Sequence, residues 1–236
     1  MKNFLKSLFI ALAPNRCAYC GKVIPPQSFM CIDCKTDLPR ISGTTCRKCG
    51  REKEKCSCKG AEKYYSSIAA PFYFMGNVRK GVHAFKFRKS FQNYKAYSYE
   101  MSNTVKNKFG SVNFDFISEI PMTSKSKKER GYNQCFWLAK GISENLGLEH
   151  KPDLLIKLYE TDKQHVLNYQ MRTGNLTGVF DVNNPSEVEG KTILLCDDIS
   201  TSGETLNECA KMLWLYGAKD IYCISVALTL SKKFIK

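Results

Sequence analysis

The chain has 236 residues, of which 43% are hydrophobic and 25% are charged. This composition excludes a wholly disordered chain, because it provides enough apolar side chains for one sizeable core and a small annex. The formal net charge is +14, and it stays positive if cysteines near the N-terminus bind zinc as thiolates. Such an excess favours polyanionic partners, either phosphates on a small molecule or a nucleic-acid backbone.

Residues 1–13 predict an amphipathic helix that docks one face on the core. Its apolar residues recur at i, i+3, i+4 and i+7: Leu5, Leu8, Phe9 and Leu12. The same stretch imitates a secretory signal, but Lys6 leaves only Ser7–Ala13 as an uninterrupted run, which is at the short limit for a signal. No stretch approaches the roughly 18 uncharged apolar residues that cross a bilayer. We therefore expect a soluble, cytoplasmic protein without a membrane span.

Eight of the twelve cysteines lie in residues 1–63. They form three CxxC pairs and a final CxC: Cys17, Cys20, Cys31, Cys34, Cys46, Cys49, Cys56 and Cys58. Two such turns together supply the four soft ligands of tetrahedral zinc. The spacing therefore predicts two Zn2+ ions, one on the first four cysteines and one on the last four, with a crossed pairing as the alternative. A disulfide framework would need an oxidising compartment, and the chain shows no convincing export signal.

Four thiolates close the coordination shell of zinc, so we expect both ions to be structural. The segment has few large apolar residues, and metal binding would supply its folding energy. We expect residues 1–63 to form a small zinc-ribbon domain and residues 64–236 to form a second domain.

The second domain alternates apolar strands with amphipathic helices. The expected strands are 67–74, 114–121, 192–196 and 221–228; the expected helices are 94–109, 135–146 and one from about 206 to 217. A basic loop is expected between the second strand and the helix that follows it. This alternation predicts an α/β fold with a mostly parallel sheet covered by helices on both faces, and ligands in such sheets bind beyond the carboxyl ends of the strands.

The most informative stretch is TILLCDDISTSGETL, residues 192–206. Here an apolar strand ends in two carboxylates, Asp197 and Asp198, and then turns into a helix. The turn predicts a monophosphate cradle of backbone N–H groups and hydroxyls at a helix N-terminus. Its residues are Ser200, Thr201, Ser202, Gly203, Glu204 and Thr205.

Bare carboxylates would repel a phosphate, so their place beside a cradle needs an explanation. A ribose 5-phosphate provides one, because its vicinal hydroxyls can donate to the acids while its phosphate occupies the cradle. The alternative is a helix cap with incidental acids.

The stretch DDISTSGETL resembles the signature of type I phosphoribosyltransferases, in which an acidic pair holds the ribose diol of phosphoribosyl pyrophosphate (PRPP) and the following loop takes its 5-phosphate. Nearly the whole chain is similar to the ComF family of bacterial competence proteins. The further matching segments, in order, are the cysteine pairs, FKFRKS (Phe85–Ser90), IPMTSKSKKERGYNQ (Ile120–Gln134) and TDKQHVLNYQMRTGNLTGVF (Thr161–Phe180).

This resemblance implies a type I phosphoribosyltransferase-like body after a zinc-ribbon start, PRPP binding with Mg2+, and a role in DNA uptake during natural transformation. Asp197 and Asp198 take the catalytic positions. The chain departs from the family at Lys157 and Tyr159, where arginines are usual. That departure puts recognition of the acceptor in doubt more than PRPP binding.

Two basic segments and a polar one complete the expected site. Lys125, Lys127, Lys128 and Arg130 would clamp pyrophosphate, or they form a solvated charge run. Lys86, Arg88 and Lys89 would close the other side. Residues 161–180 read as a lid that excludes water, with Arg172 and Gln164 as ligand contacts. His165 in that lid is a weaker candidate for a general base.

Two classes of function fit these residues. One is a magnesium-dependent phosphoribosyl transfer to an unidentified acceptor. The other is a non-catalytic module that senses PRPP or handles single-stranded DNA, with the zinc segment as a docking platform for a helicase or other DNA-uptake partner. Aromatic and basic residues alternate around 85–95 and could stack bases, or they are the core and surface of a strand-to-helix junction.

Overall fold

The computed structural model describes residues 14–58, 62–87, 90–158, 179–231 and 234. Its centre is a parallel sheet in the order β1-β8-β7-β3-β4, with β2 beside β8 as well. The strands are β1 (Ser67–Ala69), β2 (Phe72–Tyr73), β3 (Phe116–Glu119), β4 (Glu149–His150), β7 (Thr192–Ser200) and β8 (Asp220–Leu228). The expectation of a mostly parallel sheet is confirmed.

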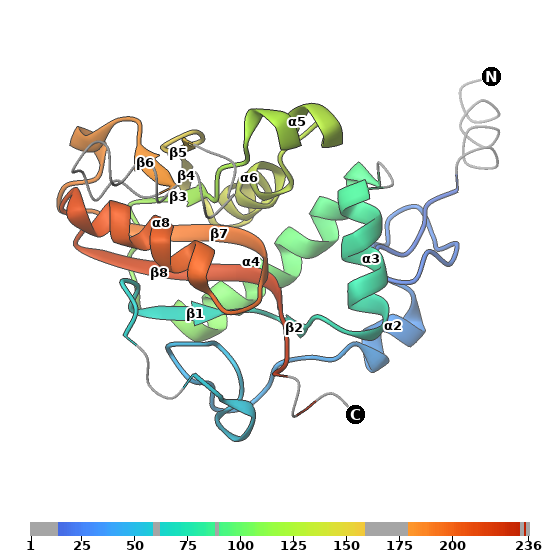
Figure 1. Cartoon of the computed structure of the whole chain (residues 1–236). Coiled ribbons are helices and arrows are strands. Elements are labelled where there is room, and N and C mark those ends of the chain that lie inside the picture. Colours follow the sequence, from blue (N-terminus) through green and yellow to red (C-terminus); the bar gives the residue numbers. More distant parts are fainter. Residues whose placement is uncertain (1–13, 59–61, 88–89, 159–178, 232–233, 235–236) are drawn as a thin grey trace.

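Helices cover both faces of this sheet (Figure 1). On one face lie α4 (Tyr94–Phe109) and α6 (Gln134–Leu146), and on the other lies α8 (Glu204–Leu215). Side chains along β7 alternate between the two cores. Leu194 and Cys196 pack in the core of α4 and α6, whereas Ile193 and Leu195 pack in the core of α8. A strand buried on both faces explains why this run is continuously apolar.

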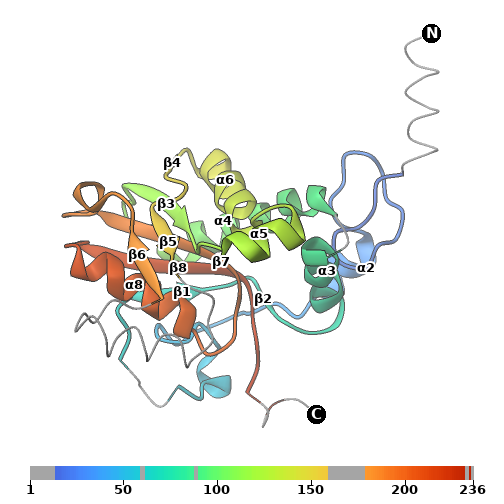
Figure 2. The same cartoon turned by 45° about the horizontal axis from the view of Figure 1, so that its top comes forward.

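Shorter elements lie around the sheet. They are α3 (Gly76–Phe87), α5 (Ser124–Arg130), the antiparallel pair β5 (Leu155–Lys157) and β6 (Phe180–Val182), and three 3-10 turns, η1 (Lys53–Lys55), η2 (Phe91–Asn93) and η3 (Pro185–Glu187). Figure 2 shows α5 between α6 and α3. Within the described residues, no helix is both long and apolar enough to cross a membrane.

The cysteine-rich segment forms two knuckles that contact the body at different places. The first leads into α2 (Ile32–Asp37) and packs against α3 and α4, where Tyr97 donates from its hydroxyl to the carbonyl oxygen of Ala18 at 2.8 Å. The second lies against β1 and the end of β8 (Figure 1). The helix expected over residues 1–13 lies outside the described residues.

Several expected elements differ from the structure. The strand expected over 67–74 is two short strands, and β7 continues past Cys196 to Ser200 because Asp197, Ile199 and Ser200 still pair with β8. The basic loop is the helix α5, with the Thr123 hydroxyl capping its start and Gly131 ending it at a φ of 83°. The expected strand-to-helix junction at 85–95 is wrong, since α3 precedes it.

Candidate functional site

The two carboxylates lie side by side near the carboxyl end of β7, which is central in the sheet. Asp197 pairs in register with Ser225 of β8, and the strand ends three residues later at Ser200. Both acids are buried, with 9% of Asp197 and 8% of Asp198 exposed. Apart from each other, the two acids have different nearest neighbours.

Asp198 faces α3. Its Oδ2 atom lies 2.7 Å from the Nζ atom of Lys86, in the last turn of that helix. Both side chains are largely shielded from solvent. Lys86 belongs to the basic segment that was expected to close one side of the site, and the structure brings it to the acid pair. Arg88 and Lys89 lie outside the described residues.

Asp197 faces the start of α6. The thiol of Cys135 donates to its Oδ1 atom at 3.6 Å, and the backbone N–H of Asp198 donates to the same atom at 2.7 Å. Burial, followed by the charge of Asp198, raises the pKa of Asp197 to about 7. Burial and the two acids also hold the pKa of the Cys135 thiol well above its usual value. Asp197 is therefore partly protonated near neutral pH in the absence of a ligand.

The expected phosphate cradle is a tight turn between β7 and α8. Ser200 is buried at the end of the strand, Thr201 and Ser202 are exposed, and Gly203 caps α8 at a φ of 78°. Glu204 and Thr205 lie in the first, exposed turn of the helix. Gly203 has no side chain to cap the helix start, and the N–H of Glu204 donates to the Ser202 hydroxyl at 3.5 Å. First-turn N–H groups have no partner inside a helix, so they suit an anion.

The basic residues of α5 lie near this site but are not all turned toward it. Arg130 stacks over the ring of Phe87 at 5.2 Å, next to the helix end that carries Lys86. Lys127 lines a cavity of about 510 Å3 beside the carboxyl end of β3, the strand next to β7. Lys125 and Lys128 are exposed on the same helix. Arg172, Gln164 and His165 of the expected lid lie outside the described residues.

A largely buried contact between a histidine and a carboxylate at the same end of the sheet was not anticipated from the sequence. The Nε2 atom of His150, on β4, lies 2.7 Å from the Oε2 atom of Glu119, on β3. Glu119 lines the cavity together with three aromatic side chains, Tyr132, Phe136 and Trp137. Only the parallel pairing of β3 with β4 brings the two residues together, so no local sequence pattern marks them.

Both sets of four cysteines fit a zinc ion. Within each set the Sγ atoms lie within 4.8 Å of one another: Cys17, Cys20, Cys31 and Cys34, then Cys46, Cys49, Cys56 and Cys58. Tetrahedral zinc with Zn–S bonds of about 2.3 Å separates its sulfurs by about 3.8 Å. The closest Sγ pairs are 3.4–3.7 Å apart, and all these cysteines are free of disulfides. The structure thus groups the first four cysteines together and the last four together, as in the simpler of the two pairings, and not in the crossed one.

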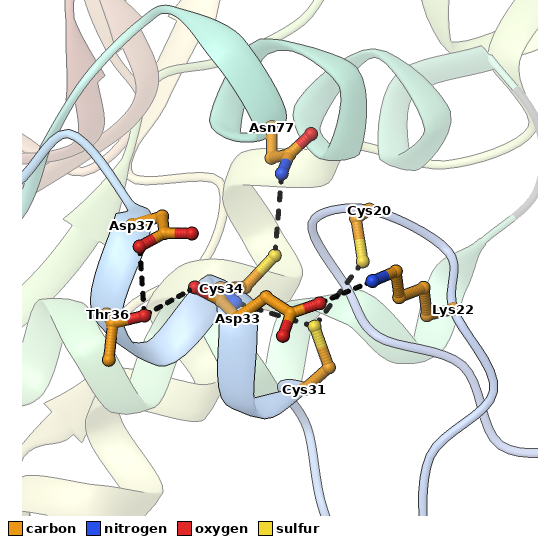
Figure 3. A network of polar contacts seen from close by, with 8 residues as sticks. All are labelled: Cys20, Lys22, Cys31, Asp33, Cys34, Thr36, Asp37 and Asn77. Atoms are coloured by element: carbon orange, nitrogen blue, oxygen red, sulfur yellow. Dashed lines mark hydrogen bonds and ion pairs between the residues drawn. The ribbon is translucent and has the colours of Figure 1, made fainter.

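Backbone N–H groups lower the pKa of one cysteine in each cluster, whereas burial raises that of Cys20, Cys34 and Cys49. Burial alone would raise the pKa of Cys17, but backbone N–H groups, first that of Cys20, outweigh it and lower the pKa to about 7. The same balance, with the N–H groups of Cys49 and Lys48, lowers the pKa of Cys46 to about 7. Figure 3 shows the sulfur atoms of three first-cluster cysteines close together.

Two further polar contacts lie next to the first cysteine cluster (Figure 3). The side-chain amide of Asn77, on α3, donates to the Sγ atom of Cys34 at 3.7 Å. An ion pair joins Lys22 to Asp33, across the two halves of the knuckle. Such outer contacts orient metal ligands, and the one from Asn77 links the cluster to the body.

Comparisons with known proteins agree with this two-part plan. A double zinc ribbon domain matches residues 8–64, and a phosphoribosyl transferase domain matches residues 133–234. Competence protein ComFC of Bacillus subtilis is 28% identical over 81% of this chain and 80% of its own length. ComFC of Streptococcus pneumoniae is 28% identical over 85% of this chain and 88% of its own. DNA utilization protein YhgH of Escherichia coli K12 is 29% identical over 47% of this chain and 48% of its own.

The sheet, its flanking helices and the matched domain define a protein with a type I phosphoribosyltransferase-like fold, preceded by a zinc-ribbon segment. The long matches to the two ComFC proteins carry the assignment further. The chain is similar to competence proteins of the ComF family over four fifths or more of its length.

Proposed function

We propose that this protein binds PRPP together with Mg2+ and transfers the phosphoribosyl group to an acceptor. The observation that carries the proposal is the buried acid pair at the end of β7, followed directly by an anion-binding turn at the start of α8. Together the two features suit a ribose 5-phosphate, whose diol and phosphate lie at opposite ends of one small ligand.

Each part of the site has a role in this proposal. Asp197 and Asp198 accept hydrogen bonds from the ribose 2- and 3-hydroxyls. The N–H groups at the start of α8 and the hydroxyls of Thr201 and Ser202 hold the 5-phosphate. Lys86 neutralises Asp198 before the ligand arrives. The cations of α5 would meet the pyrophosphate, which is the most highly charged part of PRPP.

The transfer breaks the bond between C1 of the ribose and a pyrophosphate oxygen and forms a bond from C1 to a nucleophilic atom of the acceptor. Pyrophosphate leaves with the bonding electron pair, and the acceptor's proton passes to water. Mg2+, when bound with PRPP, neutralises charge on the leaving group. The protein's contribution is to orient the sugar and to place fixed charges beside it.

The names of the relatives suggest the setting. Two are competence proteins and one is a DNA utilization protein. These relatives support a role in the use of DNA that enters the cell, and we propose that the PRPP site serves that role.

Calorimetry with PRPP and Mg2+ tests the site. We expect binding by the native chain and its loss in the double variant Asp197→Asn, Asp198→Asn, because the diol then loses both charged acceptors. Asp220→Asn, at the amino end of β8, is the matched control and should bind normally. Heat of binding that survives in the double variant would refute the assignment. Release of pyrophosphate on addition of a cell extract separates a transferase from a sensor.

A second candidate, binding of single-stranded DNA, is favoured by the exposed face of α3. Arg79, His83 and Phe87 recur every four residues on that face, and the rings of His83 and Phe87 lie 4.8 Å apart. A groove of about 750 Å3 separates α3 from the first zinc knuckle and is lined by Arg16, Arg79 and Lys80. Cations and stacking rings along a groove suit a single strand. Salt-sensitive oligonucleotide binding that survives the Asp197, Asp198 double change would place the DNA here.

A further inference from the structure

Arg51 belongs to the second zinc knuckle but directs its side chain into the phosphoribosyltransferase-like body. Its Nη2 atom donates to the carbonyl oxygen of Thr201 at 2.6 Å. Thr201 belongs to the turn between β7 and α8 (residues 201–203), which we call the phosphate turn. Its Nε atom donates to the carbonyl oxygen of Thr229, just after β8, at 2.7 Å. Only 8% of the residue is exposed. One guanidinium thus bridges the turn and the chain segment beside it.

The backbone of Arg51 is part of the metal-binding turn. Its carbonyl oxygen accepts the N–H of Cys46 at 2.8 Å, and the N–H of Gly50 donates to the carbonyl oxygen of Cys46 at 2.8 Å. Arg51 lies between the two halves of the second cluster, two residues after Cys49 and five before Cys56. The position of its side chain therefore depends on the shape of the metal-binding turn.

The knuckle also fits the body too closely to shift. A Cβ atom at Gly50 would lie 2.7 Å from Cδ1 of Leu228 and 3.1 Å from the carbonyl oxygen of Ile68. The Tyr65 hydroxyl donates to the carbonyl oxygen of Lys48 at 2.8 Å, and it would lie 3.1 Å from a Cβ atom at Gly203. Tyr65, which hydrogen-bonds the knuckle, thus lies close to the turn that Arg51 bridges.

The charge of Arg51 adds to the effect of its position. Its two carbonyl partners are neutral, and its side chain also hydrogen-bonds the side chain of Cys49, a member of the second cluster. A cavity of about 360 Å3 beside it is lined by Lys48, Lys63 and the exposed hydroxyl residues Thr201 and Ser202. An arginine remains charged at any physiological pH, so this side of the turn carries a permanent positive charge.

We propose that Arg51 is a positioning residue for the 5-phosphate turn, and that the second zinc knuckle is thereby a working part of the ligand site and not only a separate structural module. This inference rests on the proposed binding of PRPP. It has a reciprocal consequence, because two coupled sites affect each other equally. If the intact knuckle strengthens binding of the ligand, the bound ligand must stabilise zinc in that knuckle.

The test compares Arg51→Gln with Arg47→Gln, which removes an exposed arginine from the same knuckle. We expect both variants to contain two zinc ions. In calorimetry with PRPP and Mg2+, Arg51→Gln should raise the Kd about tenfold or more, as removal of a charge-assisted hydrogen bond predicts. Arg47→Gln should bind as the native chain does. Should Arg51→Gln fail to fold, Arg51→Lys keeps the charge but cannot bridge both carbonyl groups, and it should shift the Kd in the same direction.

A second readout follows the metal itself. Zinc released by a thiol-specific mercurial is recorded with a chromogenic chelator, with and without saturating PRPP and Mg2+. We expect the ligand to slow release of one of the two ions in the native chain and in Arg47→Gln, but not in Arg51→Gln. Equal affinity and equal protection in the two variants would overturn the inference. Absence of binding by the native chain would instead overturn the proposed function.

Discussion

Asp197 and Asp198 are adjacent in the chain, yet their surroundings differ. Asp198 has a cation at 2.7 Å, whereas Asp197 has a thiol, a backbone N–H group and the negative charge of its neighbour. A buried carboxyl without its own cation holds a proton more tightly than one in water. In the unliganded site the Asp197 carboxyl therefore has no charged partner, and a hydrogen bond from a ribose hydroxyl would stabilise it.

This imbalance predicts how stability depends on pH. The pKa of Asp197 is raised to about 7, so between about pH 4 and pH 7 the folded chain keeps a proton that the unfolded chain has lost. The contribution of Asp197 to stability therefore falls as the pH rises through this window. Asp197→Asn removes the effect. Between pH 4 and pH 8, the free energy of unfolding of this variant, relative to that of the native chain, should rise by at most about 4 kcal/mol.

Denaturant unfolding of both chains at several pH values measures this difference. Asp115→Asn gives the opposite sign and serves as the control. The backbone N–H of Thr192 and then Lys191 lower the pKa of Asp115, so its charge stabilises the fold once the pH rises above its unfolded pKa. A difference between Asp197→Asn and the native chain that does not change with pH would contradict the prediction.

Among individual residues, the sequence predicts the roles of those that lie together in one short segment. The acid pair and the turn after it lie on consecutive positions, so their chemistry can be inferred from spacing alone. Lys86 is more than a hundred residues from Asp198, and Arg51 is 150 residues from Thr201. Their contacts follow from the packing of α3 and of the second knuckle on the sheet, which no local pattern encodes.

Among the elements, α8 depends most on one residue. Gly203 caps the helix at a φ of 78°, where a side chain is strained, and a Cβ atom there would crowd the Tyr65 hydroxyl at 3.1 Å. This residue sets the path of the chain from β7 into the helix. A change at Gly203 would therefore alter both the shape of the phosphate turn and the start of α8.

Gly203→Ala should lower the free energy of unfolding by about 1–2 kcal/mol, the usual cost of the left-handed conformation. It should also weaken PRPP binding, because the added carbon displaces the turn. Gly147→Ala, at the end of α6, has the same strain at a φ of 68° but meets no atom within 4 Å. That variant should lose similar stability by denaturant unfolding and bind PRPP normally in calorimetry. Equal binding by both would show that the turn does not hold the ligand.

Elements with a strong apolar period were predictable. The helix expected over 94–109 has those bounds, and α6 and α8 begin within two residues of the expectation. The helix α5 was expected as a loop because residues 124–130 carry no apolar stripe; Thr123 and Gly131 mark its ends instead. The helix α3 contains two glycines, and Gly81 is needed where a Cβ atom would lie 2.3 Å from the carbonyl oxygen of Ala18.

For the molecule as a whole, the zinc segment shares its core with the body. Tyr19, which lies between Cys17 and Cys20, is 1% exposed and packs edge to face on Phe72 and Tyr97 at 5.5 and 5.4 Å. The division near residue 63 was predicted from the change in composition and remains a prediction. The close docking was not predictable, because the glycines and the single tyrosine that form it have no periodic pattern.

Removal of zinc should therefore destabilise more than the knuckles. We expect two zinc ions per chain by elemental analysis, and a midpoint of thermal unfolding that falls by more than about 10 °C after chelation. A loss of about 5 kcal/mol corresponds to such a shift in a chain of this size. Near-ultraviolet circular dichroism should change with it, because Tyr19 and Tyr97 would lose their packing. A native aromatic spectrum in the zinc-free chain would contradict this coupling.

The pairing of β1 with β8 has a consequence for biosynthesis. Ser67 is aligned with Tyr222, and β2 depends on the same late strand through Phe72 and Ala227. The ribosome makes β1 and β2 long before their partner exists, so their backbone groups wait unpaired for most of translation. A nascent chain that stalls before residue 220 exposes those edges to aggregation or to chaperones. The metal-bound knuckles, whose ligands are complete by Cys58, can form during this wait.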